Sequence, residues 1–517
     1  MPRLGLGSSL TGGAVSSDDT TSFVSTWRTT GSDETVTLPF ISSGTIDFTI
    51  NWGDGGSDAV TAYNDNLGQG AIDHVYETAD DYTITLSGTI RGFRFSNGGD
   101  KAKIRTITQW GTFQITTTSV FQGCSNLVVS AKDAPTIDTT SLLNTFQSCT
   151  SLTSLGDGET LWDVSSVENM NTMFQGTIFN GNITGWDVSS VTNMNYMFGF
   201  NAQFNQDIGS WDVSSVTVMS LMFYQATSFN GNIGNWGTKT GAVTTMASMF
   251  YNCDSFNQDI SSWDTTEVTN MSSMFRLAHT FNQDISDWNT VKVTNMSHMF
   301  NSCSAFNQDI NTSETVKWNT AAVTTMAEIF YGSGFNSDIS DWDTSNVTTM
   351  IKMFAYTSFN QDISDWDTSS LTNMQQMFYA ASAYNQPMAT SGSKWDVSNV
   401  TTFYGTFQSA SGFNQDIGNW DTSSVTAMAY TFYSATAFNQ DISSWTVAQV
   451  TSFTGFLQNN TAMSTANWNA FLVRIEDTSS QSSLSLHGGD ANATGDGAAA
   501  RLALENDHSW TIVDGDG

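Results

Sequence analysis

One peptide of about 25 residues is copied along most of the chain, and this repetition limits the possible folds more than any other feature. The copies include FNQDISSWDTTEVTNMSSMF at residues 256–275 and FNQDISDWNTVKVTNMSHMF at residues 281–300. A period near 25 is too short for a pair of helices and is typical of a solenoid with one strand per turn. We therefore predict a mainly β repeat protein of about 14 rungs. Tryptophans mark the period at Trp162, Trp186, Trp211, Trp236, Trp263, Trp288, Trp318, Trp342, Trp366, Trp395, Trp420 and Trp445.

The apolar residues of each copy are spaced to fill a shared core. In FNQDI, strand alternation places Phe, Gln and Ile on one face and Asn and Asp on the other. In VTNMSSMF, the spacing of Val, Met, Met and Phe predicts a short helical or 3₁₀ turn. We expect the Trp and Met stripes to be core rather than a cofactor site. The asparagines of FNQ, such as Asn257 and Asn282, are predicted to form a ladder of stacked amides between rungs.

The repeat resembles a known family. The pattern of FNQDIS, WDTSSVTNM and MF is similar to the BspA-type leucine-rich-repeat surface proteins over residues 101–460, and FQGCSNL at residues 121–127 resembles another element of that family. The resemblance implies a right-handed leucine-rich-repeat solenoid. It also implies adhesion or surface binding, rather than catalysis, as the role.

Residues 21–100 follow a different pattern. TIDFTINWGDG and HVYETADDYTITLSG alternate apolar and polar residues and are separated by turn residues. The WGDG motif and the following His, Tyr and YTI resemble a polycystic-kidney-disease (PKD) type β-sandwich. The resemblance makes Trp52, His74 and Tyr76 structural positions.

The two ends of the chain are also distinct from the repeats. Residues 1–20 are predicted to be an N-terminal arm, and residues 461–517 a cap. STANWNAFLVRI at residues 464–475 predicts an amphipathic helix, and AAARLALENDHSWTIVDGDG predicts a second helix and a final strand. A stack of repeats needs such a cap because its bare end would expose core.

The charge balance excludes several partners. The 49 acidic residues outnumber the 16 basic ones, so the net charge is −33. Such a surface repels nucleic acid and anionic lipid, and no apolar run is long enough to insert into a membrane. Four cysteines do not make a disulfide scaffold. We expect four buried thiols, although a disulfide between Cys124 and Cys149 remains open.

No catalytic motif is present, so we predict a protein that is not an enzyme. The five histidines form no metal-spaced pair. The aspartate of FNQDI recurs in most copies, and its expected role is hydrogen bonding in a turn. The alternative is cation binding, for which calcium is the ion that oxygen ligands favour, with Asp259, Asp284 and Asp309 as the candidate ligands.

Two copies carry insertions between Ile and Trp, NTSETVK at residues 311–317 and ATSGSK at residues 389–394. Insertions on one face of a repeat protein often lie at its binding face. We therefore take four of their residues as ligand-binding candidates, the alternative being drift in surface loops. They are Glu314, Lys317, Ser391 and Lys394.

Together these features predict a non-enzymatic structural and adhesion protein. Its repeats would bind a host-cell surface or a polysaccharide by many weak contacts. The start MPRLGLGSSLTGG lacks the hydrophobic run of a secretory signal and resembles the starts of phage virion proteins. The favoured setting is a virion surface, as a tail fibre or capsid decoration whose N-terminal region contacts other virion proteins. A secreted bacterial surface adhesin and a spacer without a ligand are the alternatives, and homo-oligomerisation remains open.

Overall fold

The computed structural model describes residues 19–41, 47–60, 72–312, 318–388 and 395–515. The chain divides into two compact units, residues 1–236 and 237–517. Each unit is described here by itself. The mainly β, repeated organisation predicted from the sequence is confirmed, and helices are confined to short stretches.

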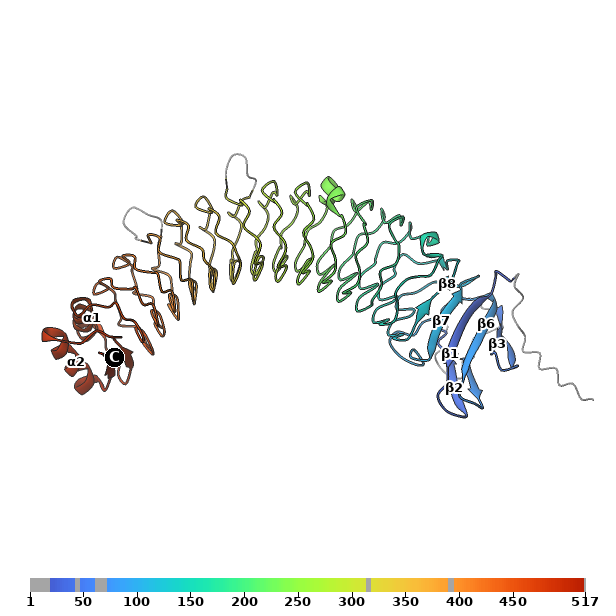
Figure 1. Ribbon diagram of the computed structural model, residues 1–517, viewed down its shortest axis with the longest axis horizontal. Coiled ribbons are helices and arrows are strands. Elements are labelled where there is room, and N and C mark those ends of the chain that lie inside the picture. The colour runs from blue at the N-terminus through green and yellow to red at the C-terminus, as the bar shows by residue number, and fades with distance from the viewer. Residues whose placement is uncertain (1–18, 42–46, 61–71, 313–317, 389–394, 516–517) are drawn as a thin grey trace, which may run out of the picture. The chain divides into compact units, whose positions relative to one another are not determined.

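Unit 1 begins with a six-stranded sheet in the order β4-β3-β6-β1-β7-β9. All its neighbours pair antiparallel except β7 and β9, and Figure 1 shows β3, β6 and β1 side by side. β7 and β9 lie beyond residue 100, so the sheet includes residues that the sequence analysis assigns to the repeats. The strands are β1 (Phe23–Arg28), β3 (Asp47–Asn51), β4 (Ser57–Val60), β6 (Asp81–Thr89), β7 (Ile104–Gln109) and β9 (Val128–Val129).

A second sheet of unit 1 pairs β2 (Glu34–Leu38) with β5 (Ile72–Tyr76). The three residues singled out in the sequence meet here. The His74 ring stacks on buried Trp52 with centroids 4.5 Å apart, and Tyr76 donates its hydroxyl hydrogen bond to the Trp52 carbonyl at 2.7 Å. Their contacts are those of structural residues, because each ring is used to pack or to satisfy the backbone.

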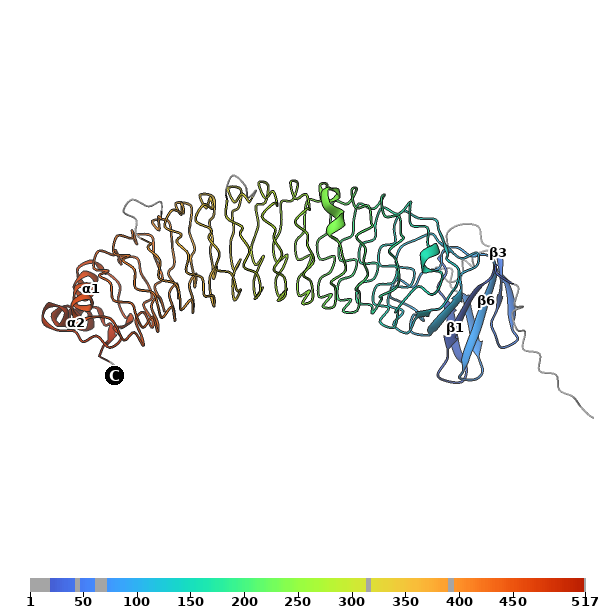
Figure 2. The same cartoon turned by 45° about the horizontal axis from the view of Figure 1, so that its top comes forward.

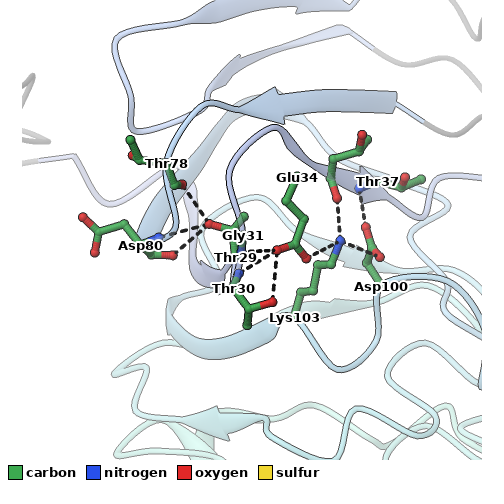
Figure 3. A network of polar contacts seen from close by, with 10 residues as sticks. Thr29, Thr30, Gly31, Glu34, Thr37, Thr78, Asp80, Asp100 and Lys103 are labelled. Carbon is green, nitrogen blue, oxygen red and sulfur yellow. Dashed lines mark hydrogen bonds and ion pairs between the residues drawn. The ribbon is translucent and has the colours of Figure 1, made fainter.

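A polar network around Lys103 ties β2 to the turn before β7 (Figure 3). Lys103 Nζ lies 3.1 Å from Glu34 Oε1 and 3.1 Å from Asp100 Oδ1. Glu34 also accepts the backbone N–H groups of Thr30 and Gly31, and Asp100 accepts that of Thr37. The N–H of Thr30 and the ammonium of Lys103 lower the pKa of Glu34 to about 2. The carboxylate therefore stays charged, and the network intact, over the physiological pH range.

In both units, successive repeats pair in parallel through one isolated bridge per repeat. Examples are Asn169 with Asn193 in unit 1 and Asn270 with Asn295 in unit 2. The remaining elements along the repeats are short: β8 (Gln114–Ile115), β10 (Thr136–Ile137) and the 3₁₀ turns η2 (Glu159–Leu161) and η3 (Gly234–Thr240).

The pairing runs through residues 269–278, TNMSSMFRLA, and their counterparts, which we call the ladder segment. The N–H groups of Met271, Ser273, Phe275 and Leu277 donate to carbonyls of the next repeat at 2.9–3.1 Å. The N–H groups between them close turns within the segment, as Met274 does onto Met271 at 3.2 Å. The predicted helical or 3₁₀ turn is confirmed only in part. Single turns close onto the residue three before, as in a 3₁₀ turn, but alternate N–H groups leave the segment and Ser273 has a φ of 56°, so no helix continues through it. The bridges also lie here and not in FNQDI, where alternation predicted the strand.

Stacked side chains fill each unit, as the offsets in the sequence predicted. The phenylalanine that ends the MxxMF motif of each repeat stacks on its counterparts along unit 2. The ring centroids of Phe275 and Phe300 are 5.8 Å apart, and those of Phe300 and Phe330 are 5.9 Å apart. Each rung adds a second ring, as Phe306 does 4.0 Å from Phe300. The tryptophans are buried as well, and Trp288 Nε1 donates to the Ile260 carbonyl of the preceding repeat at 3.0 Å. The predicted core role of the Trp and Met stripes is confirmed.

The asparagines of FNQ form a ladder, but through the backbone rather than through stacked amides. Asn257 Oδ1 accepts the N–H of Asn282, and Asn282 Oδ1 accepts the N–H of Asn307, each at 3.0 Å. Gln308 Nε2 donates to Asn282 as well, so the glutamine is partly exposed and not on the buried face as predicted. Phe306 and Ile310 are buried, as alternation predicted.

Unit 2 ends in the predicted cap. Helices α1 (Thr465–Thr478) and α2 (Gly495–His508) pack together (Figure 2), and Ser464 caps α1 by accepting the Asn467 N–H. Strand β11 (Ser485–His487) continues the parallel pairing through a bridge from Phe453 to Leu486, and β12 (Thr511–Val513) pairs parallel with β11. The buried side of α1 therefore covers the last repeat.

Replacing Phe300 by Ala should lower the free energy of unfolding of unit 2 by about 3–5 kcal/mol, because the ring is fully buried between two stacked neighbours. Urea unfolding followed by tryptophan fluorescence measures the loss. Phe300→Leu, which keeps most of the volume, should cost clearly less. Equal losses for the two variants would show that the stack is not tightly packed.

Candidate binding surface

The aspartates proposed as calcium ligands are each engaged in their own turn. Asp259, Asp284 and Asp309 are exposed, and their Oδ1 atoms accept the N–H two residues later at 3.0, 2.9 and 3.0 Å. The bond from the Ser261 N–H lowers the pKa of Asp259. Among the described residues, no three His, Cys, Asp or Glu side chains converge as metal ligands would. The turn role has direct support, and a calcium site at these residues stays a prediction.

The ligand-binding candidates of the two insertions lie outside the described residues: Glu314, Lys317, Ser391 and Lys394. The core on either side of the first insertion is undisturbed. Trp318 Nε1 donates to the Ile285 carbonyl, and Trp342 Nε1 to the Ile310 carbonyl, both at 2.8 Å. The insertion therefore leaves the tryptophan spacing intact.

A different surface emerges from the ladder segment. In a typical repeat the two Met side chains and the Phe are buried in the core. The two residues after the first Met and the two after the Phe lie on the outer side, and most of them are at least partly exposed. In the repeat of Met350 these are Ile351, Lys352, Ala355 and Tyr356, of which only the small Ala355 is buried. We call these four positions, in the twelve repeats from Met170 to Phe453, the ladder face.

The ladder face is the part of the repeat that varies within this chain. FNQDI recurs unchanged in many copies, whereas the ladder-face positions hold Ser, Gln, Asn, Gly, Ala and aromatic residues in changing order. Nine of the chain's 13 tyrosines occupy these positions, and all nine are at least partly exposed. Tyrosine is thus concentrated where packing does not require it. The nine are Tyr196, Tyr224, Tyr251, Tyr331, Tyr356, Tyr379, Tyr404, Tyr430 and Tyr433.

The ladder face carries little of the chain's negative charge. Its acidic or basic residues are Arg276, Glu328 and Lys352, in a chain with 49 acidic residues. The carboxylates gather elsewhere, as in a cavity of about 530 Å³ in unit 2 that is lined by two aspartates from each of two adjacent repeats: Asp341, Asp343, Asp365 and Asp367. A partner that meets the ladder face is therefore not repelled by local charge.

Two of the charged residues of the face, Glu328 and Arg276, contact uncharged partners on it. His298 Nδ1 lies 3.2 Å from Glu328 Oε2, and Asn301 Nδ2 donates to the same oxygen at 2.9 Å. Burial lowers the pKa of His298, so the imidazole is neutral at physiological pH. Arg276 lies over the Tyr251 ring, 5.6 Å from its centroid.

Aromatic rings meet at steep angles on the face of each unit. In unit 2, Tyr356 is 50% exposed and its ring lies 5.4 Å from Tyr331 at 71° and 4.9 Å from Tyr379 at 86°. A hydrogen bond with Tyr379 raises the pKa of Tyr356 to about 12, so the phenol is neutral. In unit 1, Phe200 is 45% exposed and meets Tyr224 at 5.2 Å and 73°.

The sequence analysis placed its candidate residues on the insertions and did not single out this face. The information was present in the sequence, because aligning the copies on their MF residues separates the constant positions from the variable ones. What was missing was the direction of each side chain, since the predicted helical turn would have spread the variable positions around an axis.

Comparison with protein families gives one match. The model described as "Mycoplasma protein of unknown function, DUF285" matches residues 140–242, 238–317, 311–393 and 388–480, which together cover more than half of the chain. The chain belongs to the DUF285 family. Comparisons with curated proteins and with solved structures found no match. The DUF285 matches contain all of the ladder-face positions defined above.

The four cysteines are buried in the core and do not reach the ladder face. Cys124, Cys149, Cys253 and Cys303 are fully buried and form no disulfide. Burial raises the pKa of Cys124, Cys149 and Cys303, so these groups stay protonated.

In the part of the chain that the structure describes, no helix is long and apolar enough to cross a bilayer.

The cysteines inside and beside the DUF285 repeats should therefore resist thiol reagents. With Ellman's reagent at pH 8, we expect no rapid reaction of the folded protein and four equivalents of reactive thiol after denaturation. Mass spectrometry of the labelled chain identifies the sites. Rapid labelling of any one cysteine in the folded protein would contradict the burial described above.

Proposed function

We propose that this protein is a non-enzymatic binding protein whose ladder face recognises a surface ligand. In this proposal the repeats form a right-handed leucine-rich-repeat-like solenoid of about 14 rungs, as in BspA-type proteins. The observation that carries the proposal is the presence of bulky aromatic residues at strained, outward-facing positions. These residues do nothing for the core and are unfavourable for the backbone.

The strain is visible in the backbone angles. Tyr196, Phe200, Tyr356 and Tyr430 have φ of 60°, 58°, 59° and 58°. A residue with a side chain in this left-handed region costs about 1 kcal/mol or more relative to glycine. Other repeats place glycine at the equivalent positions, so the fold accepts the cheaper residue. Positive φ recurs at these positions in other repeats, as at Ser273 and Lys352, so the fold imposes it. What favours a role in recognition is that bulky aromatic rings are kept there in place of glycine.

The composition of the face supports the same role. Tyrosine with serine, asparagine, glutamine and glycine is the mixture found in antibody paratopes, where rigid rings supply contact area and small polar groups supply hydrogen bonds. A spacer without a ligand has no use for a face that varies from repeat to repeat. An enzyme needs groups with distinct acid and base roles, and the ladder face has Glu328 and His298 as its one such pair, already bonded to each other.

The setting is part of the proposal. An acidic, repeated body with one variable face of low charge suits an adhesion protein outside the cell. We place it on a virion surface, as a tail fibre or capsid decoration held by its N-terminal region, and the PKD-like residues 21–100 would act as a spacer. A secreted bacterial surface adhesin is the second candidate, because the resemblance to BspA-type surface proteins points to it.

Replacing Tyr356 by Asn separates recognition from stability. Asn tolerates the left-handed backbone, so the variant should be as stable as the parent or more stable by about 0.5–1 kcal/mol. Binding to whatever the face recognises should weaken. The measurement is capture of the labelled full chain on an array of bacterial surface polysaccharides and cell-surface proteins, with thermal unfolding measured in parallel.

The matched control is Ser358→Asn, an exposed position two residues away and off the ladder face. We expect it to bind as the parent does. A bound array component whose capture is unchanged in Tyr356→Asn and in Phe200→Asn, or no capture by any component, would leave the spacer as the better account.

A further inference from the structure

A recurring arrangement on the ladder face points to the class of ligand, and this step rests on the function proposed above. In each unit one aromatic ring occupies the second position after the Phe of its repeat. In the next repeat a tyrosine occupies the first position after the Phe. We call such a pair an aromatic corner: Phe200 with Tyr224 in unit 1, and Tyr356 with Tyr379 in unit 2.

Each aromatic corner stands beside a glycine, and we call the space left by the missing side chain its hollow. The repeat before Phe200 has Gly176 at the equivalent position, and the repeat before Tyr356 has Gly332. A Cβ placed on Gly176 or on Gly332 would approach no atom closer than 3.8 or 3.6 Å. We call the ring of Phe200 or Tyr356 the standing ring of its corner. On one side it is bordered by a residue without a side chain, and this leaves room for a flat group against it.

The corner in unit 2 has small residues on both sides. Ala380 follows Tyr356 at the equivalent position of the next repeat, and Ala355 lies between Tyr331 and Tyr379. Each of the three repeats thus has one aromatic and one small residue after its Phe, and their order reverses from one repeat to the next. The Tyr356 ring lies at 71° to the Tyr331 ring and at 86° to the Tyr379 ring, so the hollow at Gly332 has an aromatic residue at the position before it and at the equivalent position of the next repeat.

The dimensions and charge of these hollows fit a sugar ring. Parallel pairing sets successive repeats about 4.8 Å apart, which is close to the length of one pyranose in an extended β-linked chain. The C–H face of such a ring packs on an aromatic face, and hydroxyl or acetamido groups can bond to side-chain amides such as those of Gln375 and Gln376 on the Tyr379 repeat. The lack of a basic cluster disfavours an anionic chain or a nucleic acid.

We propose that each aromatic corner is a subsite for a neutral, linear, β-linked polysaccharide that runs along the ladder face of its own unit. A sugar ring occupies the hollow over Gly332 or Gly176 and packs against the standing ring of Tyr356 or Phe200. Neighbouring sugars lie on the following repeats. A protein partner is the less suitable occupant, because its interface would need a contiguous apolar centre rather than rings separated by gaps.

Calorimetry on the full chain with defined oligosaccharides tests the assignment. The probes are cellohexaose and chitohexaose as neutral linear chains, their disaccharides for length dependence, maltohexaose as a curved chain and a polygalacturonate hexamer as an anionic one. We expect at least one neutral linear hexamer to bind about tenfold more tightly than its disaccharide and than the curved or anionic hexamer.

Variants locate the bound chain. Tyr356→Asn and Phe200→Asn remove the standing rings, and Gly332→Asn fills a hollow with a residue that tolerates its φ of 60°. Each should weaken binding by about tenfold or less, and the double variant of Tyr356 and Phe200 by more than either alone. Ser358→Asn should bind as the parent does, and thermal unfolding should be unchanged in the hollow-filling variant.

The outcomes separate this proposal from the function on which it rests. Binding of the curved or anionic chain alone, or capture of array proteins with no oligosaccharide bound, overturns the ligand class while a binding role for the face survives. Binding of a neutral linear hexamer that none of the face variants weakens overturns both the subsites and the ladder face as the binding surface.

Discussion

The structure depends on how the backbone N–H groups of the ladder segment are divided. Alternate groups, such as those of Met271 and Ser273, bond to the next repeat, and the groups between them close turns within their own. This division is possible only if residues such as Ser273 adopt positive φ. Every repeat therefore satisfies its backbone without a continuous strand or helix, and each needs a neighbour to do so.

That constraint sorts the side chains into two groups. Turning the chain at every second or third residue sends Met and Phe inward, where rings such as those of Phe275 and Phe300 stack at 5.8 Å. The residues between them are held outward at fixed intervals on a rigid backbone. Most of these positions are free to vary because the backbone hydrogen bonds and the core do not depend on their side chains, the exceptions being buried residues such as Asn301 and Ala355. This freedom is what makes the ladder face suitable for recognition.

Much of this architecture could be predicted from one sequence, and the failures have a common cause. The period, the buried Trp and Phe stripes, the asparagine ladder and the capping helix α1 follow from residue spacing. The helical turn was predicted because Met271, Met274 and Phe275 fall at helical offsets, and a positive φ at Ser273 leaves no trace in residue type. Because the turn was predicted correctly only in part, the side chains of the ladder segment that face outward could not be identified. The candidate residues were therefore placed on the two insertions.

The central claim is that the constant positions build the stack and the ladder face is free of that task. A complete substitution scan of residues 341–365, with the displayed full chain selected for protease resistance, tests it most directly. The account predicts that Ile351, Lys352 and Tyr356 accept nearly every residue, with glycine and asparagine favoured at Lys352 and Tyr356, where φ is positive, while Trp342 and Phe354 accept almost none. Equal intolerance at Tyr356 and Phe354 would contradict it.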